Sequence, residues 1–121
     1  MKLEQSVINR LRKIVGEKEV LDQKEDLIPY SFDGTAALKQ YPGCVVFTHT
    51  TAQVSEILKL ANSEDIAVVT RGSGTGLSGG SLPSDRCIVL CTVKMNQILE
   101  LDSANLTLMT EPGATTLAIA E

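Results

Sequence analysis

The chain has 121 residues, the size of one domain or of part of one. Its net charge of −4 and its aromatic content of 3% argue against a nucleic-acid partner, which would call for a basic surface or stacking aromatic rings. No apolar run approaches the ~20 residues of a membrane span, and the N-terminus lacks the apolar core of a secretory signal.

The three cysteines predict neither a disulfide nor a metal site. Cys87 and Cys91 fall in one predicted strand, where their Cα atoms would lie about 13 Å apart at roughly 3.3 Å per residue. A disulfide needs Cα atoms within about 7 Å. The single histidine cannot complete a zinc site with them. We therefore interpret Cys44, Cys87 and Cys91 as small buried apolar residues, and we expect a protein of the reducing cytoplasm without a metal.

The N-terminal third predicts a helix and then a segment without a clear pattern. Apolar residues recur at helical spacing over residues 3–15, and Gly16 is a helix stop signal. Residues 17–40 are mixed, and pattern alone assigns them no role; Tyr30 is interpreted as a packing residue. We predict an N-terminal helical segment over residues 1–41, which ends at the turn signal of Pro42.

The middle of the chain predicts a β-α-β unit. Residues 44–47 form a short apolar run, typical of a strand that is covered on both faces. Thr50 and Gln53 have the spacing of a capping box at a helix start. Residues 66–69 form a second strand, which should run parallel to the first. The predicted buried face of the helix consists of Val54, Ile57, Leu58 and Ala61.

Further strands follow this unit. Residues 87–91 predict a third buried strand, whereas residues 98–102 and 106–110 alternate in polarity and predict an antiparallel hairpin. A helix is expected to start at Thr115 or Thr116. Because this helix pattern runs into the last residue, we expect the chain to be part of something longer.

A glycine-rich stretch over residues 70–81 holds five of the 9 glycines. It leaves the carboxyl end of a predicted strand, where ligands of α/β sheets bind. Glycine allows a close approach to the backbone, and successive N–H groups form nests for anions. Arg71 adds a planar charge that suits phosphate, and several side chains add hydroxyl donors. These residues predict a cradle for a diphosphate.

Two familiar glycine motifs do not account for this stretch. Residues 74–79 fit the pattern G-x-G-x-x-G, but no helix follows directly, as a dinucleotide fold of that type requires. A Walker loop needs Gly-Lys-Ser/Thr at its end, and this stretch has Gly80-Ser81 there. A flexible solvent loop remains the alternative interpretation.

Three segments together resemble a known family of flavoproteins. Residues 71–80, Met95-Asn96 with Ile98, and Glu111-Pro112-Gly113 resemble the flavin-binding half of the vanillyl-alcohol oxidase / p-cresol methylhydroxylase superfamily. Within it, the match is closest to the group of the glycolate oxidase D subunit and D-lactate dehydrogenase. The resemblance implies an α+β fold, an FAD-binding PCMH-type domain over residues 42–121 that is incomplete at its C-terminus. A small parallel β-α-β lobe would be joined to the start of a second, antiparallel lobe, which is truncated.

The resemblance also implies how FAD would be held. One loop would wrap the pyrophosphate, and a Pro-Gly pair would lie against the cofactor from the other lobe. In relatives with covalently linked flavin, the linking histidine aligns with Thr75, so noncovalent FAD is expected. Thr48 and Thr70 stand where the group often has proline. The residues implied to bind FAD are Arg71, Gly72, Ser73, Gly74, Thr75, Gly76, Leu77, Ser78, Gly79, Gly80, Pro112 and Gly113.

The implied function is that of the FAD-binding portion of an oxidoreductase. The whole protein would oxidise a 2-hydroxy acid of the glycolate or D-lactate type, with hydride transfer to flavin and with redox partner subunits. It would be cytoplasmic, or peripheral to the membrane in an intact complex. No catalytic residue is predicted in this chain, and the chain alone should be inactive. The alternatives are a non-catalytic nucleotide- or anion-binding module that is complete in itself, and a structural α/β interaction domain.

Overall fold

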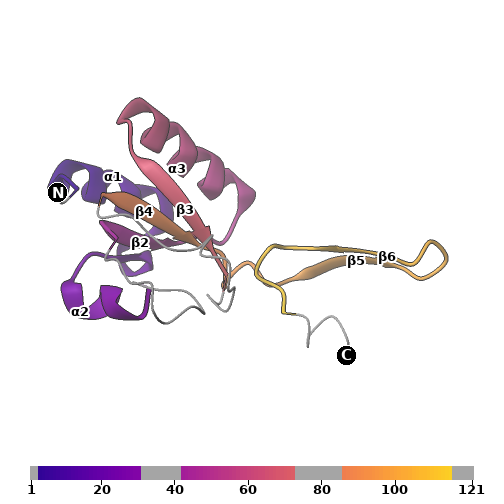
Figure 1. Ribbon diagram of the computed structural model, residues 1–121. Coiled ribbons are helices and arrows are strands. Elements are labelled where there is room, and N and C mark those ends of the chain that lie inside the picture. Colours follow the sequence, from indigo (N-terminus) through magenta and orange to yellow (C-terminus); the bar gives the residue numbers. More distant parts are fainter. Residues whose placement is uncertain (1–2, 31–41, 73–85, 116–121) are drawn as a thin grey trace.

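A four-stranded sheet and a separate hairpin carry the fold of the computed structural model, which describes residues 3–30, 42–72 and 86–115. The sheet contains β1 (Val20–Leu21), β2 (Cys44–Phe47), β3 (Ala67–Arg71) and β4 (Cys87–Cys91) in the order β1-β2-β4-β3 (Figure 1). β4 pairs in parallel with both β2 and β3, and β1 pairs antiparallel with β2. The fold class predicted from the sequence is confirmed.

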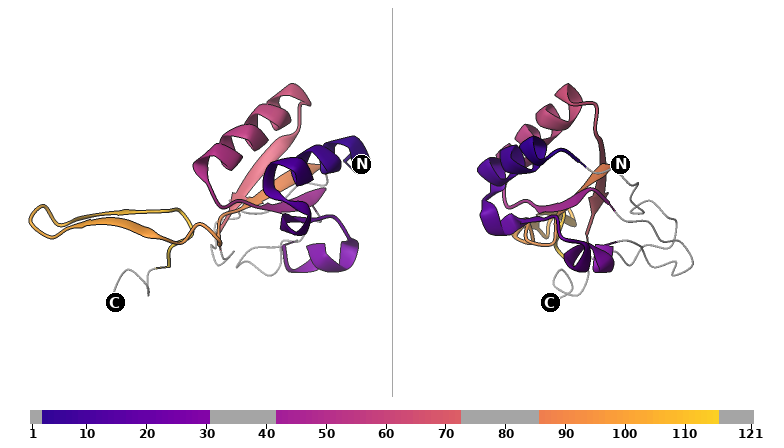
Figure 2. Two further views of the ribbon diagram at one scale, coloured as in Figure 1. Left: turned by 180° about the vertical axis from the view of Figure 1, so that it is seen from behind. Right: turned by 90° about the vertical axis from the view of Figure 1, so that its left-hand side faces the viewer.

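Helices cover both faces of this sheet. α1 (Gln5–Val15) and α3 (Thr51–Ser63) pack on one face, against Val46 and Leu90 among others. On the other face, α2 (Lys24–Leu27) and the 3-10 turn η2 (Ile28–Tyr30) pack near Val45 and Val89. A further 3-10 turn, η1 (Glu17–Glu19), connects α1 to β1. Figure 2 shows the two helical layers on opposite sides of the strands.

α1 confirms the helix predicted from apolar periodicity. Its buried residues are Val7, Ile8, Leu11 and Val15. The helix ends at Gly16, whose φ of 106° lies in the region that favours glycine and whose N–H donates to the Arg12 carbonyl. Because α1 contributes to the same cluster as β2, α3 and β4, residues on both sides of position 42 share one core.

α3 begins with the predicted cap, in a modified form. The Gln53 N–H donates to Thr50 Oγ1 at 3.1 Å, as a capping box requires. The Gln53 side chain accepts from the N–H of His49, one residue before the cap, at 2.7 Å. The prediction that Leu58 is buried is wrong, because α3 leans toward α1 and buries Leu60 in its place, while Leu58 stays 48% exposed.

The three predicted parallel strands form, but the first two are not neighbours. β4 lies between β2 and β3, and every residue of β2 and β4 is buried. β3 is the edge strand and is only partly covered. All three cysteines are buried, as predicted. Burial raises the pKa of Cys44 to about 12, so this thiol stays protonated at neutral pH.

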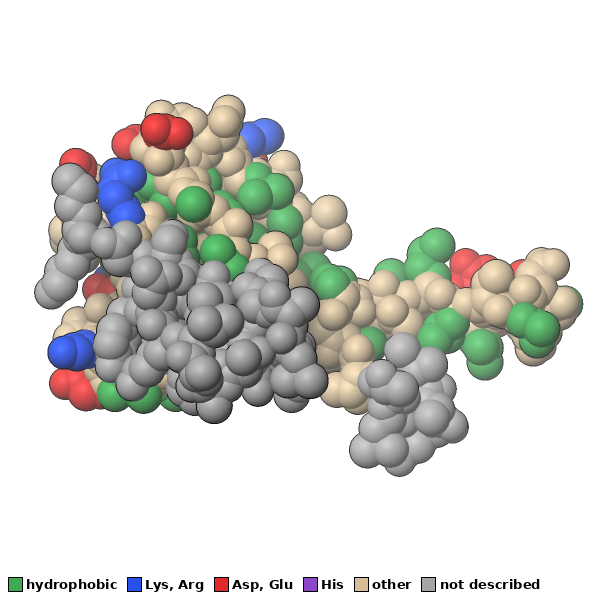
Figure 3. All heavy atoms as spheres, viewed as in Figure 1, with side chains coloured by type: hydrophobic (Ala, Val, Ile, Leu, Met, Phe, Trp, Pro, Cys, Tyr) green, Lys and Arg blue, Asp and Glu red, His purple; other side chains and the backbone are tan. Residues whose placement is uncertain are grey.

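The predicted hairpin is confirmed as β5 (Ile98–Asp102) and β6 (Thr107–Thr110), which pair antiparallel. The second strand begins after Leu106, because that residue has a φ of 55° and belongs to the turn. The hairpin projects away from the sheet (Figures 1 and 2), and Figure 3 shows hydrophobic side chains along this arm. The helix predicted from Thr115 or Thr116 onward lies outside the described residues.

Candidate functional site

The carboxyl ends of β2, β3 and β4 meet at one edge of the sheet. Cys91 is the register partner of both Phe47 and Arg71, so the three strands end at the same level. Parallel strands place their ligand sites at this edge. Among the predicted site residues, the structure describes Arg71, Gly72, Pro112 and Gly113, while the predicted contacts over residues 73–80 lie outside the described residues.

Arg71 is the last residue of β3, and its side chain is largely buried. Its Nη2 donates to the Pro29 carbonyl at 3.2 Å, and its Cζ lies 5.2 Å from the centroid of the Tyr30 ring. Both contacts come from η2, so the segment without a sequence-assigned role holds this guanidinium. A contact between Arg71 and phosphate stays a prediction.

Tyr30 and Phe47 form the aromatic part of this edge. Their rings meet edge to face, with centroids 5.9 Å apart. Burial raises the pKa of the Tyr30 hydroxyl, which therefore stays protonated at neutral pH. The interpretation of Tyr30 as a packing residue agrees with these contacts, although its contact with Arg71 gives no signal in the sequence.

Gly72 follows β3 directly and is part of the predicted cradle. A Cβ built at Gly72 meets nothing within 4 Å, so open space adjoins its backbone. Its carbonyl accepts a long hydrogen bond from Cys91 Sγ at 3.7 Å. Space beside the backbone at the end of a parallel strand is the condition under which a diphosphate can approach main-chain N–H groups.

Gly113 is enclosed where Gly72 is open. A Cβ at Gly113 would overlap the Thr92 carbonyl oxygen and would lie 2.7 Å from the Met95 carbonyl oxygen. Its N–H donates to that Met95 carbonyl at 2.6 Å. Gly113 therefore lets the chain after the hairpin pack closely against the turn that follows β4, a role that sequence reasoning did not assign to it.

A charged cluster at the same edge was not predicted from the sequence. Lys94 Nζ lies 2.7 Å and His49 Nε2 lies 3.3 Å from Glu19 Oε2. Lys94 Nζ also lies 4.7 Å from the centroid of the Phe47 ring. The hydrogen bond from Lys94 holds the pKa of Glu19 below its usual range. These residues are far apart in the sequence, so no local pattern could have paired them.

Thr48 shows why one departure from the family pattern is accommodated. Its N–H donates to the Cys91 carbonyl at 3.3 Å, and its hydroxyl donates to Met95 Sδ at 3.1 Å. A proline at this position would lack the N–H donor. Threonine therefore adds two buried contacts at the exit of β2.

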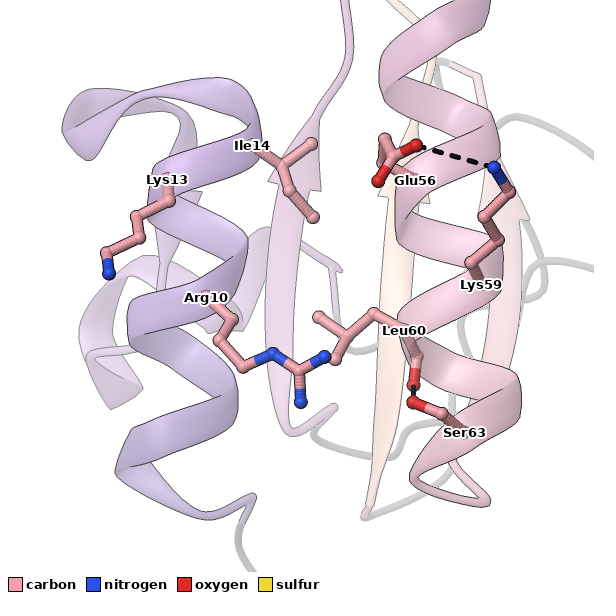
Figure 4. A pocket seen from close by; sticks show the side chains of 7 residues that line it. All are labelled: Arg10, Lys13, Ile14, Glu56, Lys59, Leu60 and Ser63. Atoms are coloured by element: carbon pink, nitrogen blue, oxygen red, sulfur yellow. Dashed lines mark hydrogen bonds and ion pairs between the residues drawn. The ribbon is translucent and has the colours of Figure 1, made fainter.

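A surface pocket of about 470 Å³ lies elsewhere, between α1 and α3 (Figure 4). None of the predicted site residues lines it. Lys59 pairs with Glu56 at 3.5 Å, and Arg10 pairs with Glu64 at 3.0 Å. The mixed charges of this pocket indicate no particular ligand. Within the described ranges, no group of three His, Cys, Asp or Glu side chains could hold a metal, and no helix is long and apolar enough to cross a membrane.

Comparisons with known proteins bear on the predicted family. Residues 42–121 match a family described as the FAD binding domain. The chain is 37% identical over 116 residues to glycolate oxidase subunit GlcD of Escherichia coli K12, covering 96% of this chain and 23% of that protein. It is 40% identical over 114 residues to D-lactate dehydrogenase of Archaeoglobus fulgidus, covering 91% and 24%.

A solved structure supports the fold. The crystal structure of p-cresol methylhydroxylase with substrate bound superposes with a TM-score of 0.84 at 24% identity, covering 96% of this chain and 23% of that one. The chain thus spans about a quarter of the length of the relatives that it matches. The resemblance stated from the glycine-rich loop and the Glu-Pro-Gly segment is confirmed.

Proposed function

The chain belongs to the FAD binding domain family, and from this premise we propose that it is the FAD-binding portion of an oxidoreductase that acts on 2-hydroxy acids of the glycolate or D-lactate type. The similarity to glycolate oxidase subunit GlcD and to D-lactate dehydrogenase supports this substrate class. The observation that carries the proposal is the joint ending of three parallel strands beside the open backbone of Gly72.

The described residues fit a bound dinucleotide at this edge. Open space adjoins Gly72, where main-chain N–H groups would face the pyrophosphate, and Arg71 stands at the entrance of the loop. Residues 71–80 would hold the pyrophosphate, and Pro112 and Gly113 would lie against the cofactor from the side of the hairpin. When bound, FAD supplies the acceptor for the substrate hydride. This chain would bind and orient the cofactor, and we assign it no catalytic residue.

We further propose that FAD binds noncovalently, since threonine at position 75 has no imidazole to form the link. The whole protein would be cytoplasmic, or peripheral to the membrane in an intact complex, and would pass electrons to redox partner subunits. The chain alone should show no turnover with glycolate or D-lactate and an artificial electron acceptor.

A fluorescence titration tests the proposal on the purified chain. The flavin fluorescence of FAD should be quenched saturably as the chain is added, and ADP should compete with FAD for the site. Riboflavin, which lacks the pyrophosphate, should bind at least about tenfold more weakly than FAD. Acid precipitation should release all flavin into the supernatant. A Gly72→Val variant should bind FAD more weakly while remaining folded, because its side chain enters the open space beside the backbone.

Three outcomes would count against the proposal. Riboflavin binding as tight as FAD binding would exclude a diphosphate cradle. Equal affinity for ADP and FAD would favour the alternative of a non-catalytic nucleotide-binding module. Absence of FAD binding by the purified wild-type chain would refute the proposal as a whole.

A further inference from the structure

We propose that Thr92 and Met95 form a positioning bridge that fixes the distance between the end of β3 at Arg71 and the Pro112-Gly113 segment. The inference rests on the proposed function, because these are the described parts of the two segments that we assign to FAD. Neither Thr92 nor Met95 is among the residues assigned to the cofactor. Their role would be to hold those residues in place.

Thr92 forms the half of the bridge that reaches β3. It directly follows β4 and is only 8% exposed. Its N–H donates to the Arg71 carbonyl at 2.8 Å, and its Oγ1 donates to the same oxygen at 3.3 Å. The first bond continues the parallel ladder, whereas the second is made by the side chain and depends on the hydroxyl.

Met95 forms the half that reaches the hairpin exit. Its N–H donates to the Thr92 carbonyl at 2.8 Å, which closes a tight turn. Its carbonyl accepts from the Gly113 N–H at 2.6 Å, and its sulfur accepts from the buried Thr48 hydroxyl. The Met95 side chain is 4% exposed, so it anchors this turn in the core.

Close packing couples the two halves. The space that a Cβ would need at Gly113 is occupied by the Thr92 carbonyl oxygen. A shift of Gly113 toward Thr92 therefore presses on the residue that hydrogen-bonds to the Arg71 carbonyl, although positions 71 and 113 are far apart in the sequence. Because these groups are buried, their hydrogen bonds act in a low dielectric and tolerate little displacement.

The hairpin depends on the same junction. Just beyond the turn, the Glu111 N–H donates to the Gln97 carbonyl at 2.9 Å, and the Gln97 N–H donates to the Glu111 carboxylate at 3.1 Å. These bonds close the base of the hairpin, two residues along the chain from Met95 on one side and from Gly113 on the other. Thr92 and Met95 thus connect three parts of the chain: the strand that starts the glycine-rich loop, the hairpin base and the Pro-Gly segment.

Amide hydrogen exchange tests the bridge without FAD. Thr92→Val keeps the branched shape and removes the hydroxyl, Thr92→Ser keeps the hydroxyl, and Thr107→Val is a control on the exposed strand β6. We expect Thr92→Val to speed exchange at Thr48, Met95 or Gly113 by at least about fivefold, and Thr92→Ser and Thr107→Val to stay within about twofold of wild type. Conversely, Gly113→Ala should speed exchange of the amide at position 92.

The same variants are then titrated with FAD under conditions where circular dichroism shows them folded. Thr92→Val should weaken FAD binding at least about fivefold, and Thr92→Ser should restore it. Unchanged exchange in both Thr92→Val and Gly113→Ala would overturn the bridge. Changed exchange with unchanged FAD affinity would overturn its positioning role. If wild type binds no FAD, the proposed function of this chain fails, while the exchange results still decide whether the bridge exists.

Discussion

Two glycines of the predicted site differ in what surrounds them. Gly72 adjoins open space, whereas Gly113 is closed in by the carbonyl oxygens of Thr92 and Met95. Neither glycine has a φ in the left-handed region, so the two differ in the space around them and not in backbone strain. The family resemblance implies one role for both glycines, whereas the structure shows open space beside Gly72 and close packing around Gly113.

Alanine substitution should reveal this difference. Gly113→Ala must displace backbone atoms, and overpacking of this kind costs about 1–3 kcal/mol of unfolding free energy. Gly72→Ala should change the unfolding free energy by no more than about 0.5–1 kcal/mol, and it can be stabilising. Urea unfolding of both variants measures the contrast. Equal destabilisation of the two variants would contradict the packing described for Gly113.

Glu19 predicts a dependence of stability on acid pH. Lys94 holds its folded-state pKa below the unfolded value of about 4.3, so its contribution is present above that pH and is lost as pH falls through the folded pKa. Lys94→Gln should therefore reduce the loss of unfolding free energy below about pH 4. Lys59→Gln is the matched control, since Lys59 pairs with Glu56 on the exposed surface. Identical acid profiles for both variants would refute this contribution.

At the scale of elements, α1 belongs to the same core as the strands. Its Leu11 is fully buried in the cluster that also contains Ile57 of α3 and Ile88 of β4. The predicted division at residue 42 separates this helix from the residues that match the family, and it stays a prediction. Packing nevertheless makes the stability of the strands depend on the helix.

Leucine truncation tests this dependence. Leu11→Ala should lower the unfolding free energy by about 2–5 kcal/mol, because it empties a fully buried site. Leu58→Ala on α3 should cost much less, since Leu58 is about half exposed. Denaturant unfolding followed by circular dichroism should show one transition in each case. A separate early transition in Leu11→Ala would indicate that α1 folds as an independent unit.

Local patterns predicted elements well, and their assembly less well. Some features depend only on residues that are close in the sequence, so the sequence could predict them. These are the apolar stripe of α1, the Thr50 cap and the alternating polarity of β5 and β6. The insertion of β4 between β2 and β3 depends on long-range pairing, as do the contacts of Glu19 with Lys94 and of Gly113 with Thr92. The prediction that Leu58 is buried is wrong because periodicity gives only the width of the apolar face of a helix. The position of the neighbouring helix decides which way that face points.

At the scale of the whole molecule, the hairpin has little cover from the other described residues. Of the exposed large hydrophobic residues, several belong to it, including Leu99, Leu101 and Met109. An isolated two-stranded hairpin is marginally stable, and within the described ranges neither edge of this one pairs with a further strand. Apolar side chains on an uncovered sheet are typical of a surface that packs against further chain or a partner.

Hydrogen exchange should reflect this difference in support. Backbone amides of β5 and β6 should exchange at least about 100-fold faster than those of β4, which is buried on both faces between two parallel strands. Two-dimensional NMR of the chain in deuterated buffer provides the comparison. Protection of the hairpin equal to that of β4 would show that something covers it in solution, and analytical ultracentrifugation would then reveal whether a second copy does so.

The position of β4 has a consequence for biosynthesis. The ribosome makes β2 and β3 first, yet these strands share no hydrogen bonds, and each finds its parallel neighbour only when β4 emerges. Until then, the nascent chain holds two apolar strands that await the same partner. Of the four strands described in this sheet, β4 is thus the last to be translated, and the arrival of residues 87–91 is the step that allows the growing polypeptide to close the sheet.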